Sequence, residues 1–174
     1  MKKTIAENEA LLLIDIQDVY FTPGPYLLNK PCEAAETARK ILDKFRQEEK
    51  PVIHVKHDFP MFSGIHKKVA PLPEEKIVFK KYPNSFLGTD LRDYLESRKI
   101  KKLTVVGMMS HMCVDTTVRA CQDYGYEVTV IADACTTKDL TFDGRKIDAE
   151  TVHRSFMAAL DGMFAKVIRI DELL

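Results

Sequence analysis

The alternation of short, unbroken apolar runs with amphipathic stretches constrains the fold of this chain more than any other feature. The first run reads ALLLID over residues 10–15 and shows no alternation of apolar with polar side chains. Such a run is typical of a strand that is buried on both faces of a parallel sheet. Segments of helical period follow these runs, so we expect the chain to form βαβ units.

We predict a mostly parallel sheet of six strands with helices on both faces, which is a three-layer α/β/α, Rossmann-like architecture. The predicted strands cover residues 10–15, 51–55, 77–79, 103–106, 127–132 and 167–170. The predicted helices cover residues 33–49, 91–98, 112–124 and 147–161. Gly125 is expected to end the third helix as a C′ glycine.

Length and charge exclude several classes of protein. The 174 residues suit one domain, spanning 1–174. The 26 basic residues equal the 26 acidic residues in number, which argues against a nucleic-acid footprint. The longest apolar runs fall far short of the ~20 residues that cross a bilayer. Glu7, Asn8 and Glu9 interrupt any secretion signal, so we expect a cytoplasmic protein with free thiols and no membrane partner.

Polar residues follow several of the predicted strands. In open parallel sheets, ligands bind outside the carboxyl ends of the strands, at the point where the strand order reverses. Asp15 follows the first predicted strand, Lys80 and Lys81 follow the third, and the segment 107–113 follows the fourth. These positions are therefore the candidates for a functional site.

Cys113 is the one cysteine of the four whose setting favours reactivity. It lies at the predicted start of a helix, where the helix dipole and unpaired N–H groups lower the pKa of a thiol and can hold an oxyanion. Alternatively, Ser110 caps this helix and occupies one of those N–H groups. Cys121 repeats the buried face of the same helix, and Cys32 and Cys135 have no comparable setting.

Asp15 and the two lysines each allow two interpretations. A carboxylate directly after an apolar strand is partly buried, so its pKa rises unless a cation or hydrogen-bond donors hold it. Asp15 either serves a functional site or accepts backbone N–H groups near Asp18. Lys80 and Lys81 are either both solvated, or one of them points inward and pairs with a carboxylate such as Asp15.

Three segments together carry a resemblance to a known family. They read LLLIDIQ at residues 11–17, KKYPNSFLGTDL at residues 80–91 and VVGMMSHMCVDTTVRACQDYGYEVTVIADAC at residues 105–135. In this order and spacing they resemble the isochorismatase-like cysteine hydrolases, a superfamily that includes nicotinamidases, N-carbamoylsarcosine amidohydrolase and streptothricin hydrolase. The resemblance covers nearly the whole chain from Ala10 onward and implies the isochorismatase-like hydrolase fold.

The resemblance implies a catalytic triad of Asp15, Lys80 and Cys113. Lys80 is preferred to Lys81 because the family pattern sets three residues between the lysine and the tripeptide that here reads Asn84-Ser85-Phe86. In the mechanism that the family implies, Asp15 takes the proton from the Cys113 thiol, and Lys80 stabilises the charged pair.

The resemblance also implies a cis peptide between Met108 and Met109, which directs the N–H of Met109 and that of Cys113 at the substrate oxygen. The implied function is a cofactor-independent, cysteine-dependent hydrolase that cleaves an amide-type C–N bond of a small molecule through a thioester. Isochorismatases proper lack the nucleophilic cysteine and cleave a vinyl ether, so Cys113 argues against that reaction. The alternative is a non-catalytic small-molecule-binding or partner-interaction protein with a vestigial site. Nucleotide binding is not favoured, because no GxGxxG or P-loop follows the first strand.

Several further expectations concern ligands and assembly. We expect no metal; the alternative is a zinc site of three histidines, because imidazoles suit zinc. One of these histidines, His54, lies in the predicted strand 51–55 and should face the core or a helix. Members of the family are commonly homodimers or larger, and we expect the same here. The alternative zinc ligands are His54, His57 and His66. The residues that we expect to line a mainly apolar substrate pocket are Gln17, Phe21, Phe59, Tyr82, Met109 and His111.

Overall fold

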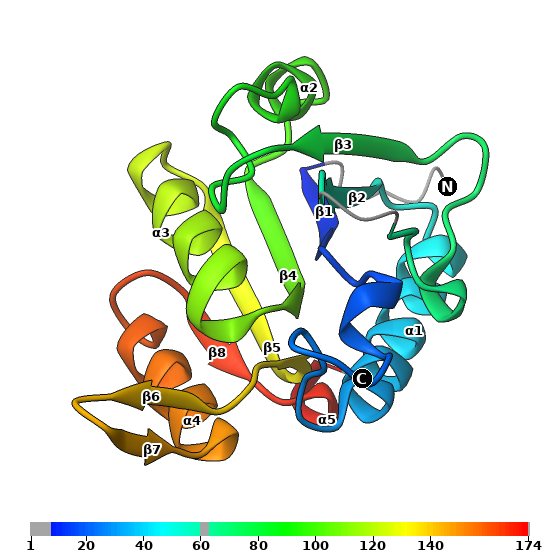
Figure 1. Cartoon of the computed structure of the whole chain (residues 1–174). Coiled ribbons are helices and arrows are strands. Elements are labelled where there is room, and N and C mark those ends of the chain that lie inside the picture. Colours follow the sequence, from blue (N-terminus) through cyan, green and yellow to red (C-terminus); the bar gives the residue numbers. More distant parts are fainter. Residues whose placement is uncertain (1–7, 60–62, 174) are drawn as a thin grey trace.

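The computed structural model describes residues 8–59 and 63–173, which form a six-stranded sheet with helices on both of its faces (Figure 1). All neighbouring strands in this sheet are parallel, and their order is β3-β2-β1-β4-β5-β8. The strands are β1 (Glu9–Ile14), β2 (Val52–His57), β3 (Lys76–Lys80), β4 (Lys102–Met108), β5 (Glu127–Thr136) and β8 (Lys166–Ile168). The predicted fold class is therefore confirmed.

Strand β1 lies in the middle of the sheet and is buried on both faces. Its residues alternate between two cores: Leu12 and Ile14 contribute to one, and Leu11 and Leu13 to the other. This explains why the run ALLLI is continuous, because a strand that is covered on both faces needs apolar side chains at every position.

The helices divide between the two cores. Helix α1 (Pro31–Gln47) and the short α5 (Ile170–Leu173) pack on the face to which Leu11 and Leu13 point. Helices α2 (Leu91–Ser97), α3 (Asp115–Asp123) and α4 (Ala149–Leu160) cover the opposite face (Figure 1). Within residues 8–59 and 63–173, no helix combines the length and the apolar character that crossing a bilayer requires.

The end of α3 follows the prediction for Gly125. This glycine has a φ of 79°, in the left-handed region, and its N–H donates to the carbonyl oxygen of Gln122 at 2.9 Å. The N–H of Tyr126 donates to the carbonyl oxygen of Cys121 at 3.0 Å. These two bonds form a Schellman motif, in which a C′ glycine stops the helix.

Several parts of the fold differ from the prediction. The antiparallel hairpin of β6 (Leu140–Phe142) and β7 (Arg145–Ile147) was not predicted, and the last long helix begins at Ala149 instead of residue 147. The hairpin turns at Asp143 and Gly144, with φ values of 49° and 68°. An Asp-Gly pair with two positive φ angles suits a two-residue hairpin turn.

The strand order reverses between β1 and β4. From β1 the chain proceeds through β2 to β3 on one side, and from β4 through β5 to β8 on the other. The carboxyl ends of β1 and β4 thus form the switch point where open α/β sheets bind ligands. Asp15 follows directly after β1, and Met109 follows directly after β4.

Candidate active site

The local backbone geometry directs the side chains of Asp15 and Lys80 toward each other in the interior of the protein. Asp15 has a φ of 50°, a left-handed conformation that aspartate tolerates better than most residues, and its side chain is fully buried. In β3, Phe79 is 64% exposed, whereas Lys80 is 1% exposed. Because side chains alternate across a strand, Lys80 is therefore the inward-pointing lysine, and Lys81 is exposed.

Cys113 lies in a π-helical turn, η3 (Ser110–Val114), between β4 and α3. The sequence predicted a single helix over residues 112–124, but this π-turn precedes an α-helix that starts only at Asp115. The carbonyl oxygen of Met109 accepts the N–H groups of Met112 and Val114 at 3.0 and 3.2 Å. The Met108–Met109 peptide, which leads into the turn, is cis.

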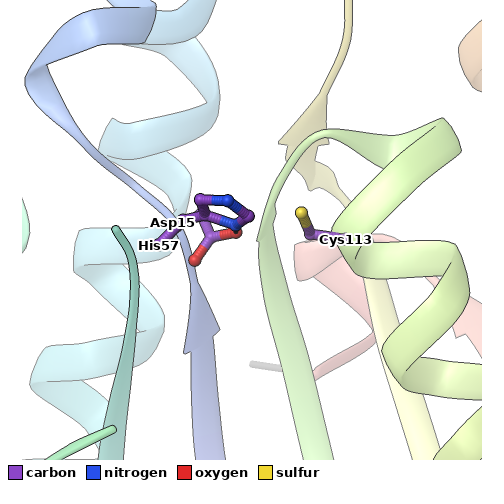
Figure 2. A group of neighbouring side chains, drawn as sticks. All are labelled: Asp15, His57 and Cys113. Carbon is purple, nitrogen blue, oxygen red and sulfur yellow. Dashed lines mark ion pairs between the residues drawn. The ribbon is translucent and has the colours of Figure 1, made fainter. Parts of the chain in front are cut away.

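The ammonium nitrogen of Lys80 lies at the centre of the cluster. It is 2.6 Å from Oδ2 of Asp15 and 3.2 Å from Sγ of Cys113. The sulfur of Cys113 points toward the Asp15 carboxylate and the His57 ring (Figure 2). Three groups from distant parts of the chain therefore meet at the switch point of the sheet.

Burial controls the protonation of this cluster. It raises the pKa of the Asp15 carboxyl above its usual range, although the charge of Lys80 acts in the opposite direction. Burial and the neighbouring Asp15 charge raise the pKa of the Cys113 thiol to about 12, against the opposing effect of Lys80. Among the described residues, neither oxygen of Asp15 has a partner with hydrogen-bond geometry, so the short contact with Lys80 is an ion pair. Both oxygens can accept a proton.

The prediction that a helix N-terminus lowers the pKa of Cys113 is therefore wrong for the resting site. The sulfur lies within the protein, 5% of Cys113 being exposed, and desolvation of the thiolate outweighs any favourable backbone dipole. The alternative that Ser110 caps the helix is wrong as well. Its hydroxyl pairs with Nδ1 of His153 at 2.7 Å, and neither the π-turn nor α3 has a side-chain cap.

His57 is a neighbour of the cluster that the sequence did not place there. It is the register partner of Lys80 in the parallel pair β2–β3. Its Nδ1 lies 2.9 Å from Nζ of Lys80 and 4.0 Å from Oδ2 of Asp15. Burial and the positive charge of Lys80 lower the pKa of His57.

The alternative zinc site of three histidines is not formed. His54 and His57 are three residues apart in β2, so they project to opposite faces of the sheet. Nε2 of His54 pairs with the Glu75 carboxylate at 2.9 Å, and the ring of His66 stacks on Phe21 with centroids 3.8 Å apart. The expectation that His54 faces the core is confirmed.

In the described part of the chain, one group of side chains has the donor spacing of a metal site: Asp15, His57 and Cys113, whose donor atoms lie within 4.8 Å of one another. The ammonium of Lys80 is in contact with all three of these residues. The positive charge among these donors is therefore that of the lysine.

The side chain of Gln17, a predicted substrate-binding residue, is bonded to backbone groups, and its role toward a substrate stays a prediction. The side chain is completely buried, and its Nε2 donates to the carbonyl oxygens of His57 and Ser63 at 3.1 and 3.0 Å. Its Oε1 accepts the backbone N–H of His57 at 2.8 Å. Gln17 thus holds the end of β2 against the segment that follows Asp15.

Aromatic side chains adjoin the cluster on the His57 side. The ring of Phe59 lies 4.9 Å from that of His57, so this predicted pocket residue is at the site. Tyr20, which the sequence did not single out, contacts Phe59 at 5.7 Å between centroids. Burial and the charges of Asp15 and Cys113 raise the pKa of its hydroxyl. A tyrosine five residues after a candidate carboxylate was the available signal.

The other predicted pocket residues lie around this region or apart from it. Met109 is buried beside the core that α1 covers. Nδ1 of His111 pairs with the Thr137 hydroxyl, and its ring contacts Phe156. Tyr82 is 53% exposed and lines a cavity of about 290 Å³ on the β3 edge. Their roles toward a substrate stay predictions.

The fold, with a buried polar cluster at its switch point, defines an α/β enzyme, and comparisons with known proteins specify its family. The family model described as the isochorismatase domain matches residues 9–172. The isochorismatase family protein YddQ of Bacillus subtilis is 44% identical over 169 residues, which cover 91% of this chain and 94% of that protein. Streptothricin hydrolase of Streptomyces noursei is 29% identical over 141 residues, which cover 76% of this chain and 51% of that protein.

A solved structure agrees with this relationship. The crystal structure of an isochorismatase from Pseudomonas putida KT2440 superposes with a TM-score of 0.92 at 33% identity, over 97% of this chain and 91% of that one. The chain belongs to the isochorismatase family, and it is a hydrolase. The resemblance of the three sequence segments to this family is thereby confirmed.

Proposed function

We propose that this hydrolase cleaves an amide-type C–N bond of a small molecule, with Cys113 as the nucleophile. The observation that carries the proposal is the position of Lys80 Nζ, in contact with both Oδ2 of Asp15 and Sγ of Cys113 in a buried site. A sulfur nucleophile suits attack on an acyl carbon, because the product is a thioester that water can hydrolyse.

The first step is proton transfer from the Cys113 thiol to the Asp15 carboxylate. The S–H bond breaks, an O–H bond forms, and one negative charge moves from oxygen to sulfur. The pKa values of Asp15 and Cys113 are both raised, so release of a proton to water is unfavourable for either group. Transfer between them leaves the net charge of the buried cluster unchanged. Lys80 stays within contact of whichever atom is negative.

The thiolate then attacks the acyl carbon, forming a C–S bond and moving the carbonyl π electrons onto oxygen. The N–H groups of Met109 and Cys113 are the donors assigned to this oxyanion. When the intermediate collapses, the C–N bond breaks, and Asp15 gives its proton to the leaving nitrogen. A water molecule then loses a proton to Asp15 and attacks the thioester carbon, forming a C–O bond. The C–S bond breaks as the acid product leaves, and the thiolate takes the proton back from Asp15.

A screen of small amides, ureas and lactams tests this function, with release of ammonia or amine as the measurement. Cys113→Ala and Asp15→Asn are expected to remain folded and to lose essentially all turnover. Cys32→Ser is the matched control, because Cys32 is exposed and lies away from the cluster on α1, so its activity should equal that of the wild type. A Cys113→Ala variant that retains more than a few per cent of turnover contradicts the assignment.

Trapping of the intermediate separates the proposal from the non-catalytic alternative. After acid quenching during turnover, mass spectrometry should find the acyl group on the peptide that contains Cys113. With Asp15→Asn, no such adduct is expected, because the thiol keeps its proton. If no tested compound acylates the protein and all four cysteines react equally slowly with iodoacetamide, a binding protein with a vestigial site is favoured.

Two properties of the assembled protein also stay predictions. We propose a homodimer or larger homo-oligomer, which light scattering on the purified protein tests. We propose a cytoplasmic location, which fractionation of cells tests.

A further inference from the structure

The side chain of His57 contacts the cluster but takes no part in the proposed chemistry. Its place follows from the sheet, because His57 and Lys80 are register partners at the carboxyl ends of β2 and β3. Nδ1 of His57 lies 2.9 Å from Nζ of Lys80. Side chains of directly opposed residues in neighbouring strands project from the same face, so this contact is built into the backbone.

The ammonium of Lys80 has three N–H bonds and three acceptor atoms around it. Oδ2 of Asp15 lies at 2.6 Å, Nδ1 of His57 at 2.9 Å and Sγ of Cys113 at 3.2 Å. A buried N–H bond without an acceptor is unfavourable, so these three atoms together hold the ammonium in place. Two of them belong to groups that react in the proposed mechanism, and the third belongs to His57.

His57 is itself held firmly. Its backbone N–H and C=O pair with Oε1 and Nε2 of Gln17 at 2.8 and 3.1 Å. Its ring packs against Phe59 at 4.9 Å between centroids. The imidazole therefore meets Lys80 from a fixed direction.

The protonation of His57 agrees with an acceptor at Nδ1. Burial and the charge of Lys80 lower the pKa of His57, which favours the neutral ring at neutral pH. A neutral ring that accepts at Nδ1 carries its proton on Nε2.

We propose that His57 is a positioning residue for the reaction of Cys113: its Nδ1 accepts one N–H of Lys80 and so fixes the ammonium in contact with both the Asp15 carboxylate and the sulfur. This inference rests on the proposed function for its meaning, but it is tested without a substrate. The measured quantity is the rate at which iodoacetamide modifies Cys113, followed peptide by peptide in a Cys32→Ser background.

Two variants separate the acceptor from the shape of the ring. His57→Asn keeps an oxygen that can accept from Lys80, whereas His57→Phe keeps an aromatic ring against Phe59 and has no acceptor. We expect Cys113 in His57→Asn to react within about threefold of the parent, and in His57→Phe at least about tenfold more slowly. Equal rates in both variants, whether fast or slow, overturn the proposal.

The wild-type protein provides a second measurement that does not depend on how the variants fold. In ¹⁵N spectra of histidine-labelled protein at pH 7.5, with His57→Asn used to assign the signals, His57 should be neutral with its proton on Nε2. A charged ring or a proton on Nδ1 overturns the proposal. Because neither experiment measures the hydrolysis of a substrate, failure to find a hydrolysed substrate counts against the proposed function and leaves the test of His57 intact.

Discussion

The Nζ atom of Lys80 lies 2.6 Å from Oδ2 of Asp15, and neither side chain retains any exposed surface. Removing two charges from water is unfavourable, and their attraction compensates only while both are present. Burial raises the pKa of Asp15 even with Lys80 in contact. The pair is therefore sensitive to the loss of either partner and to pH.

Lys80→Met is expected to lower the free energy of unfolding by about 3–5 kcal/mol at pH 8, because it leaves an unpaired buried carboxylate. Without Lys80, the pKa of Asp15 in the folded protein lies still further above its value of about 3.9 in the unfolded chain. A carboxyl group with a raised pKa in the folded state loses stability as pH rises. Urea unfolding should therefore find the variant less impaired at pH 5 than at pH 8.

The double variant Asp15→Asn with Lys80→Met is the control for this effect. It removes both charges, so most of the lost stability should return and the dependence on pH should disappear. A single Lys80→Met variant with the same deficit at pH 5 and pH 8 would show that Asp15 is not ionised in the pair.

Gly107 brings β4 against β1 just before the site. Its φ is 138°, and a Cβ atom at this position would lie 2.1 Å from the carbonyl oxygen of Ile14. The obstructing atom is backbone, so Gly107→Ala must displace one of the two strands. We expect a loss of about 2–5 kcal/mol in the free energy of unfolding, measured in urea, together with lower activity.

Gly125→Ala is the matched control for Gly107. Gly125 has a positive φ of 79°, but a Cβ atom added there would meet no other atom within 4 Å, so only the left-handed backbone is disfavoured, by about 1–2 kcal/mol. Equal losses in the two alanine variants would contradict the role of the close approach to Ile14.

The fold was predictable because buried strands need apolar residues, and these residues form recognisable runs in the sequence. The run ALLLI is continuous since β1 is covered on both faces, and each of the six predicted strands is present. The hairpin β6–β7 was missed because its strands are three residues long and largely exposed, so no apolar pattern marks them. Asp143-Gly144 at its turn was the signal that remained.

The site was predictable only in part. Strand ends and the family resemblance located Asp15, Lys80 and Cys113, but the contact of His57 with Lys80 depends on the register of β2 against β3. The apolar pattern of a strand fixes which side chains face each core, but one strand read by itself does not show which residue of another strand lies beside a given position. The prediction of a lowered pKa for Cys113 was wrong for a similar reason, because the extent to which the thiol is buried is a property of the folded chain.

Gln17→Met distinguishes a positioning role of Gln17 from substrate binding. The variant removes the side-chain partner of the backbone N–H of His57 and of the carbonyl oxygen of Ser63, whereas the carbonyl oxygen of His57 keeps the N–H of Phe59 at 3.2 Å. We expect a loss of about 1–3 kcal/mol in the free energy of unfolding and a decrease in kcat for the proposed reaction. A rise in KM with unchanged stability and kcat would instead support the sequence-based prediction that Gln17 binds substrate.

Glu75 is the centre of a buried ionic network that contains none of the proposed catalytic residues. Its carboxylate accepts from Arg46 at 2.7 and 2.8 Å and from the N–H of Leu72 at 2.8 Å, and it pairs with Nε2 of His54 at 2.9 Å. Burial raises the pKa of Glu75, but these partners together lower it to about 2. Burial also lowers the pKa of His54.

The lowered pKa values of Glu75 and His54 both make the folded protein less stable as pH falls. The unfolded chain binds more protons than the folded protein at Glu75 between pH 4 and 2, and at His54 below its usual pKa of about 6.5. The stability that Glu75 contributes is therefore present above about pH 4.3 and is lost as pH falls toward 2. Glu75→Gln should lower the free energy of unfolding by about 2–3 kcal/mol at pH 7, and the deficit should shrink at pH 3.

Glu74→Gln makes the same chemical change at the neighbouring exposed residue, and it should leave stability within about 0.5 kcal/mol of the wild type. Turnover per folded molecule should be unchanged in Glu75→Gln, because the network holds β2, α1 and the segment before β3 together without touching Lys80 or Cys113. Urea unfolding at pH 7 and pH 3 measures the effect. A deficit of Glu75→Gln that is equal at the two pH values would contradict an ionised network as its source.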